Sequence, residues 1–115
     1  MKKLLFACMV MASVFVLAGC SDSPRDVAVK WANAIADGDG KKAAEYSTET
    51  TLLTNVVLLA EVHSGERELK RFKDFIKDDL KRAEVKIDGD FAIVDTERKP
   101  DVKLKKINGK WKVNF

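Results

Sequence analysis

The first 20 residues decide how much of this 115-residue chain is available to form a folded domain. Two lysines are followed by an apolar run from Leu4 to Leu17, broken only by Ser13. At 14 residues the run is shorter than the roughly 20 that an apolar helix needs to cross a bilayer, which disfavours a permanent transmembrane helix. A short basic segment followed by such a run is typical of a cleaved secretory signal. We therefore expect residues 1–19 to be removed.

The end of the apolar run indicates the class of exported protein. Leu17-Ala18-Gly19-Cys20 resembles the lipobox, in which small residues fit the signal peptidase and the cysteine sulfur receives a diacylglycerol. We expect residues 20–23 to be a lipidated tether that anchors the chain to a membrane of the bacterial cell envelope. In Gram-negative cells an aspartate directly after the lipidated cysteine would retain the protein at the inner membrane. Ser21 at that position resembles the outer-membrane sorting pattern, which would place the protein on the periplasmic side or the surface of the outer membrane.

Removal of residues 1–19 changes the composition of the folded part. The chain has 21 basic and 18 acidic residues, and the signal contains two of the lysines and no acid, which leaves 19 bases and a net charge of +1. Cys8 is removed and Cys20 is acylated, so neither a disulfide nor a cysteine-based metal site is expected. The remainder is large enough for one domain, which we place at residues 24–115.

Residues 24–82 are expected to form helices. Ser23 can cap the first helix, Pro24 suits its first position, and Gly38 can end it in a left-handed conformation. Asp39 can cap a second helix, and the Ser/Thr-rich stretch 47–51 can cap a third. Apolar residues recur at helical spacing in the first, third and fourth helices: Val27, Trp31, Ala34 and Ile35; Leu52, Leu53, Val56, Val57 and Ala60; Leu69, Phe72, Ile76 and Leu80.

From residue 84 the apolar period changes to two, which predicts strands. Asp88-Gly89-Asp90 marks one hairpin turn, and Asn108-Gly109 marks a second. The order of elements predicts an α+β fold with N-terminal helices packed on one face of a C-terminal antiparallel sheet of about four strands. Trp31 and Trp111 are expected in its core.

The Asn108-Gly109 turn also predicts a register. Leu104 is expected opposite Val113 and Val102 opposite Phe115, while Lys103, Lys105 and Lys112 share the other face. Lys105 would lie directly opposite Lys112, a mildly unfavourable like-charge pair for which Asp95 and Glu97 are candidate partners.

The opening pattern Val27-x-x-x-Trp31-x-x-Ala34-Ile35-x-x-Gly38-Asp39-x-x-x-Ala43-Ala44 and the closing Asn108-Gly109-Lys110-Trp111-Lys112-Val113 resemble one known family. They are similar to the small nuclear-transport-factor-2-like, or cystatin-like, lipoproteins, which include lumazine-binding-like members and are mostly of unknown function. The resemblance spans nearly the whole mature chain and implies a cystatin-like fold. It implies no set of active-site residues.

Few residues are candidates for chemistry. His63, the single histidine, could act as a general acid or base, but its place at a helix end favours contact with exposed carbonyls. Pairs of aspartates flank Gly38 and Gly89, where caps and turns use them more often than metals do. The chain has neither a glycine-rich phosphate loop nor a Gly-x-Ser-x-Gly elbow. We therefore predict no catalytic residue, no metal and no cofactor.

Basic residues gather near the end of the chain. Six lysines and only Asp101 lie between Lys99 and Phe115. Lys103, Lys105 and Lys112 could contact an anionic surface such as phospholipid headgroups, or they could keep an exposed edge strand from aggregating. Export and the lack of an arginine or aromatic cluster disfavour nucleic acid.

Three functional hypotheses follow. The favoured one is a membrane-anchored, non-catalytic module that binds or scaffolds a small-molecule ligand or an envelope protein. The second is a small isomerase- or dehydratase-like enzyme that uses a pocket between helices and sheet. The third is an inhibitor or immunity-type module that binds a protein. A deep pocket lined by an acid and a tyrosine or histidine would favour the enzyme, and a filled, apolar interface between helices and sheet would favour the scaffold. An exposed aromatic patch would favour the third.

The lipobox generates a direct test. We expect mass spectrometry of the protein from native membranes to find an N-terminal Cys20 that carries the mass of its acyl groups. An unmodified Cys20 thiol on protein recovered from the soluble fraction of the native host would contradict this expectation.

Overall fold

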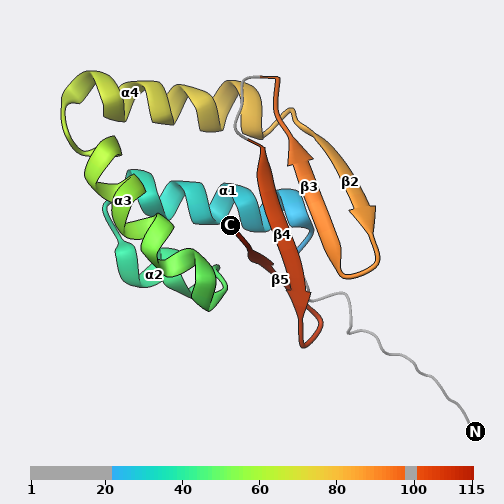
Figure 1. The fold of residues 1–115 in the computed structure, drawn as a ribbon. Coiled ribbons are helices and arrows are strands. Elements are labelled where there is room, and N and C mark those ends of the chain that lie inside the picture. Colours follow the sequence, from blue (N-terminus) through green and yellow to red (C-terminus); the bar gives the residue numbers. More distant parts are fainter. Residues whose placement is uncertain (1–21, 98–100) are drawn as a thin grey trace, which may run out of the picture.

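A computed structural model describes the fold of residues 22–97 and 101–115. Helices come first: α1 (Pro24–Ala36), α2 (Gly40–Glu45), the 3-10 turn η1 (Glu49–Thr51), α3 (Leu52–Val62), α4 (Glu66–Asp74) and the π-helical η2 (Phe75–Leu80). Strands follow: β2 (Glu84–Asp88), β3 (Phe91–Asp95), β4 (Val102–Ile107) and β5 (Lys110–Val113). The predicted α+β class is confirmed (Figure 1). The predicted signal peptide, Cys20 and Lys99 lie outside the described residues.

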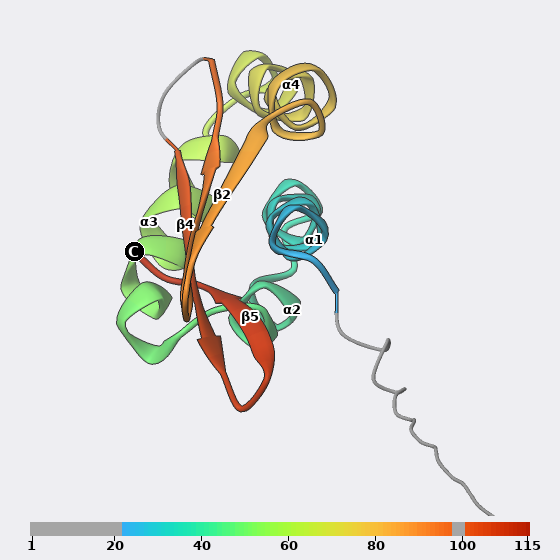
Figure 2. The same cartoon turned by 90° about the vertical axis from the view of Figure 1, so that its right-hand side faces the viewer.

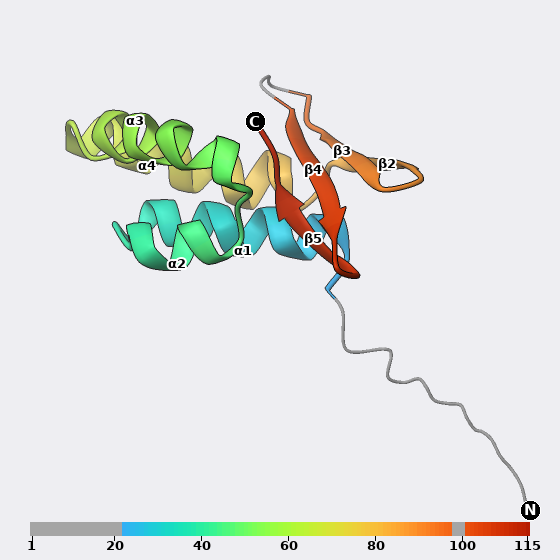
Figure 3. The same cartoon turned by 60° about the horizontal axis from the view of Figure 1, so that its bottom comes forward.

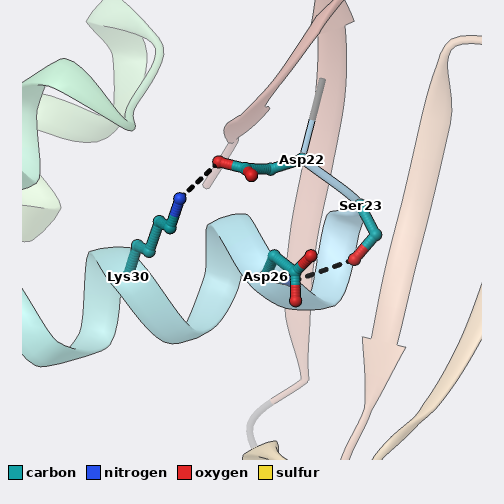
Figure 4. Close-up of polar contacts among 4 residues, drawn as sticks. All are labelled: Asp22, Ser23, Asp26 and Lys30. Atoms are coloured by element: carbon teal, nitrogen blue, oxygen red, sulfur yellow. Dashed lines mark hydrogen bonds and ion pairs between the residues drawn. The ribbon is translucent and has the colours of Figure 1, made fainter. Parts of the chain in front are cut away.

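Helix α1 begins and ends as its sequence predicts. The Ser23 hydroxyl accepts a hydrogen bond from the Asp26 backbone N–H at 3.1 Å, and Pro24 occupies the first turn (Figure 4). At the other end Gly38 has a φ of +75°, and the Asp39 N–H donates to the Ala34 carbonyl at 2.9 Å. This bond back across the last turn closes a Schellman-type cap, which needs a residue that tolerates positive φ.

The four strands form one antiparallel sheet in the order β2-β3-β4-β5. Helix α1 and the end of η2 cover one face, and α3 lies beside the sheet against α1 (Figures 2 and 3). Asn108 and Gly109 have φ of 52° and 78°, which suits a tight two-residue turn, and the predicted opposition of Leu104 to Val113 is confirmed. The predicted pairing of Val102 with Phe115 is wrong, because β5 ends at Val113.

The outer edge of β5 is bridged at its last residue, Val113, by the segment that precedes α3. The Val113 N–H donates to the Tyr46 carbonyl at 2.7 Å, and the Thr48 N–H donates to the Val113 carbonyl at 2.9 Å. Ser47 thus forms a parallel bridge with Val113. Strand β4 has a neighbour on each side, so protection of an exposed edge does not explain the lysines on β4.

The core lies between α1, η2 and the sheet. Trp31 and Trp111 are only 2% and 7% exposed, which confirms their predicted burial. Ile76 and Leu80, which belong to the predicted fourth helix, are buried in the core. The chain is π-helical rather than α-helical after Asp74. Within the described residues, no helix has both the length and the apolar character to cross a bilayer.

The burial of Trp111 predicts a large effect on stability. Trp111→Ala should lower the free energy of unfolding by roughly 3–5 kcal/mol, because it removes a packed aromatic ring and leaves a cavity. Denaturant unfolding measures the loss. Phe91→Ala is the matched control, since Phe91 is 55% exposed and should cost far less. Equal losses in the two variants would contradict the placement of Trp111 in the core.

Candidate functional site

An apolar pocket lies between α3 and the sheet, with α1 beneath it. Its volume is about 400 Å³, and only apolar atoms are exposed on its walls. The walls come from every layer of the domain: Trp31 of α1, Thr54 and Leu58 of α3, Phe72 of α4, Phe75 of η2, Val102 of β4, and Phe115. Val102 and Phe115, predicted to be cross-strand partners, meet here as two walls of one pocket.

A buried hydrogen-bond relay holds the Trp31 ring in the pocket. Its indole N–H donates to the Asn55 side-chain oxygen at 2.8 Å, and the Asn55 amide nitrogen donates to the Ser47 hydroxyl at 2.9 Å. The Ser47 hydroxyl donates in turn to the Ala43 carbonyl at 2.7 Å. Because each buried donor has an acceptor, Trp31 can present its apolar faces without the cost of an unpaired N–H.

The threonines before α3 position Phe115 over the same pocket. The Phe115 backbone N–H donates to the Thr51 hydroxyl at 2.8 Å, and that hydroxyl donates to the Val113 carbonyl at 3.1 Å. The Thr48 hydroxyl lies 2.9 Å from the Thr51 hydroxyl and donates to the Asn114 side chain at 3.0 Å. The Phe115 ring then packs on Trp31 with centroids 5.7 Å apart. Residues 48–51 do not line the pocket themselves, but they hold Phe115, which forms one of its walls.

This pocket is suited to removing an apolar group from water. Its volume falls within the range of small-molecule sites, and none of its lining residues is titratable. An apolar group that enters would gain the hydrophobic free energy and lose no hydrogen bond to the walls.

Two other hollows are polar. One, of about 300 Å³, is bordered by Asp22, Glu45, Tyr46 and residues 110–112 and so contains an acid and a tyrosine. It is bordered by the exposed Glu45 and Lys110, and the carboxylate of Asp22 is paired with Lys30 at 2.7 Å. The other, of about 460 Å³, is bordered by five carboxylates and Arg82. No cluster of three or more His, Cys, Asp or Glu in the described part of the chain is arranged to hold a metal.

The residues considered for catalysis or metal binding lie at helix ends and turns. His63 lies at a helix end, as predicted, but its ring Nε2 is 2.8 Å from the Ile35 carbonyl of a different helix, α1. Asp37 is the C-cap of α1, and the Asp39 carboxylate accepts from the Lys42 N–H at 3.0 Å. Asp88 and Asp90 flank Gly89 in the β2–β3 turn.

The predicted surface lysines are only partly brought together. Lys103 and Lys105 lie on the exposed face of β4, and Lys105 is opposite Lys112 as predicted. The Lys112 ammonium donates to the Glu45 backbone carbonyl at the end of α2, and the Lys105 ammonium lies 5.9 Å from the centre of the Phe91 ring. The Asp95 carboxylate, a predicted partner, forms an ion pair with Lys86 at 3.5 Å.

Comparisons with protein-family models, curated protein sequences and solved structures found no match to this chain.

The pocket itself was not predicted from the sequence. Leu58, Phe72 and Phe75 are ordinary members of apolar helical patterns, and such patterns do not distinguish a filled interface from an open one. One signal was present in the Ser/Thr-rich stretch 47–51, which contains more hydroxyl groups than a single helix cap needs. The three threonine hydroxyls bind residues 113–115, and the Ser47 hydroxyl belongs to the Trp31 relay.

The Trp31 relay predicts a specific loss of stability. Asn55→Ala should lower the free energy of unfolding by about 1–3 kcal/mol, because the buried Trp31 N–H and the Ser47 hydroxyl each lose a partner. Asn33→Ala on the exposed face of α1 is the control and should cost nothing. Denaturant unfolding compares the two, and an unchanged midpoint in Asn55→Ala would show that the relay contributes nothing.

Proposed function

We propose that this protein is a lipid-anchored module of the bacterial cell envelope that binds an apolar ligand and does not catalyse a reaction. The observation that carries the proposal of binding is the pocket between α3 and the sheet, whose walls expose only apolar atoms. The proposed anchor is supported by Leu17-Ala18-Gly19-Cys20 and by the apolar run before it. A cystatin-like, nuclear-transport-factor-2-like fold remains part of this proposal on the basis of the sequence patterns.

The pocket favours a hydrocarbon segment as its ligand. Each methylene group removed from water contributes about 0.8 kcal/mol, so a segment of roughly eight carbons gains about 6 kcal/mol before the cost of association. A polar end group would stay at the mouth, because no polar wall atom is available to bind it. An acyl chain or a similar hydrocarbon tail meets both conditions.

The enzyme hypothesis receives less support. It required an acid together with a tyrosine or histidine inside the pocket between helices and sheet. The tyrosine of this chain, Tyr46, borders the surface hollow near Asp22, and His63 binds a backbone carbonyl. The apolar pocket offers a place for a ligand and no group for general acid or base catalysis.

A second candidate function, protein binding, is favoured by the exposed side of α3. Four apolar side chains there are between 42% and 74% exposed: Leu52, Leu53, Val56 and Val57. No charged residue interrupts this stripe between Glu49 and Glu61.

Leu53→Lys combined with Val57→Lys should abolish co-purification of an envelope protein from native membranes if this stripe is the contact. Glu49→Gln should leave the co-purification unchanged.

A matched pair of substitutions on α3 tests ligand binding. Leu58→Trp places a large ring in the pocket and should abolish binding of a fluorescent fatty acid, whereas Leu53→Trp adds the same ring on the exposed side and should preserve it. Fluorescence titration of the Cys20→Ser protein, which lacks the acyl group, measures both. Circular dichroism confirms that each variant is folded. Equal binding by the two variants would place the ligand outside this pocket.

A further inference from the structure

One end of the domain combines positive charge with exposed apolar side chains. Residues 102–113 contain five lysines and no acid. Around the β4–β5 turn, residues 105–110, which we call the hairpin tip, place Lys105, Lys106 and Lys110 near Ile107, which is 38% exposed. The neighbouring Phe91, opposite Lys105, is 55% exposed.

The lysines of the hairpin tip lie along aromatic rings. The Lys105 ammonium is 5.9 Å from the centre of the Phe91 ring, and the Lys106 ammonium is 5.2 Å from that of Trp111. Both lysines are exposed. A lysine can lay its apolar stem against such a ring and keep its charged end in water. Apolar side chains surrounded by lysines suit the boundary between lipid headgroups and acyl chains, where charge attraction and burial of apolar surface add together.

The start of α1 lies at this same end of the molecule. Asp22 borders one hollow together with Lys110 and Trp111 of β5. Its carboxylate accepts a hydrogen bond from Lys30 at 2.7 Å, which raises the pKa of the Lys30 ammonium and directs Asp22 back along α1 (Figure 4). Cys20 precedes Asp22 by two residues, so the chain can separate them by roughly 7 Å at most.

We propose that the hairpin tip docks on the anionic surface of the membrane that holds the anchor. The inference rests on the proposed acylation of Cys20, because that anchor keeps the start of α1, and the hairpin tip beside it, close to the bilayer. Lys105, Lys106 and Lys110 contact lipid phosphates, and Ile107 and Phe91 enter the headgroup layer. Asp88 and Asp90 lie in the β2–β3 turn at the same end of the sheet, where the Lys106 N–H donates to the Asp90 carbonyl at 2.7 Å. The proposed contact is therefore confined to the acid-free β4–β5 turn and the Phe91 ring beside it.

This assignment differs from the trio predicted from sequence. Lys112 is occupied by the Glu45 carbonyl, and Lys103 lies opposite Ile93, farther along β4 from the turn. The far end of α1 carries the contact between His63 and Ile35. A helix of 13 residues is about 20 Å long, so the α3–α4 turn at Ser64 is held away from the docked surface.

The acylated protein in vesicles provides the test. A fluorophore is placed at Ile107→Cys or, as the control position, at Ser64→Cys; an acylated Cys20 sulfur cannot react with it. In phosphatidylglycerol vesicles that carry quenchers on their acyl chains, we expect stronger quenching at position 107 than at position 64. In phosphatidylcholine vesicles at about 0.15 M salt, where charges are screened beyond roughly 8 Å, the difference should shrink.

Charge-matched variants assign the effect to the tip. Combined Lys105→Gln, Lys106→Gln and Lys110→Gln should abolish the difference in phosphatidylglycerol vesicles. Combined Lys41→Gln, Lys42→Gln and Lys73→Gln, which removes three exposed charges elsewhere, should preserve it. Equal quenching at positions 107 and 64 in labelled protein that keeps all three tip lysines would overturn the docking proposal.

Mass spectrometry of the same preparation separates the two proposals. A free Cys20 would overturn the anchor. The docking proposal would then be decided by sedimentation of that chain with phosphatidylglycerol vesicles: binding lost only in the variant at positions 105, 106 and 110 would support it, and absence of binding at low salt would overturn it.

Discussion

The connection between the helical half and the sheet at Val113 is the interaction on which the rest of this structure depends. Tyr46 and Thr48 pair with both backbone groups of Val113, and the Thr51 hydroxyl also binds its carbonyl. These bonds bridge the edge of β5 at Val113 and place the start of α3 beside the end of that strand. Without them the wall formed by Thr54 and Leu58 would lose its connection to Val102 and Phe115 on the sheet side of the pocket. A short polar segment thus determines the position of an apolar pocket.

Trp31 connects this junction to the proposed function. Trp31 is buried in the core, and its ring forms part of the pocket wall. Its N–H donates the first hydrogen bond of the relay through Asn55 and Ser47. Buried polar groups that are fully paired make an arrangement specific, because any displacement leaves a donor or acceptor without a partner. The relay therefore keeps α2, α3 and the ring in one geometry while the pocket wall itself stays apolar.

The proposed ligand site and the proposed membrane contact lie at different places along α1. The hairpin tip is beside the first turn of α1, and Trp31 is seven residues further along, about 10 Å at the rise of a helix. A domain docked through its tip would hold the pocket above the headgroups and leave the exposed stripe of α3 free. Ligand, lipid surface and protein partner could then be contacted at the same time.

The sequence by itself determined the features that depend on neighbouring residues. Ser23, Gly38, Asn108 and Gly109 have backbone preferences that operate within a few residues, so the ends of α1 and the register of β4 with β5 were predictable. Burial of Trp31 and Trp111 followed from periodicity. The α+β class followed from the order of the patterns.

Only the tertiary structure decided which distant groups meet. Thr51 and Phe115 are 64 residues apart, and so are Thr50 and Asn114. Whether two apolar surfaces close on one another or leave a pocket depends on how α3 approaches the sheet, and periodicity carries no information about that distance. The same limit applies to the lysines: alternation placed Lys105 opposite Lys112, but only the packing of α2 against β5 gave Lys112 the Glu45 carbonyl. Contacts between segments depend on the whole arrangement, whereas caps and turns depend on the few residues that form them.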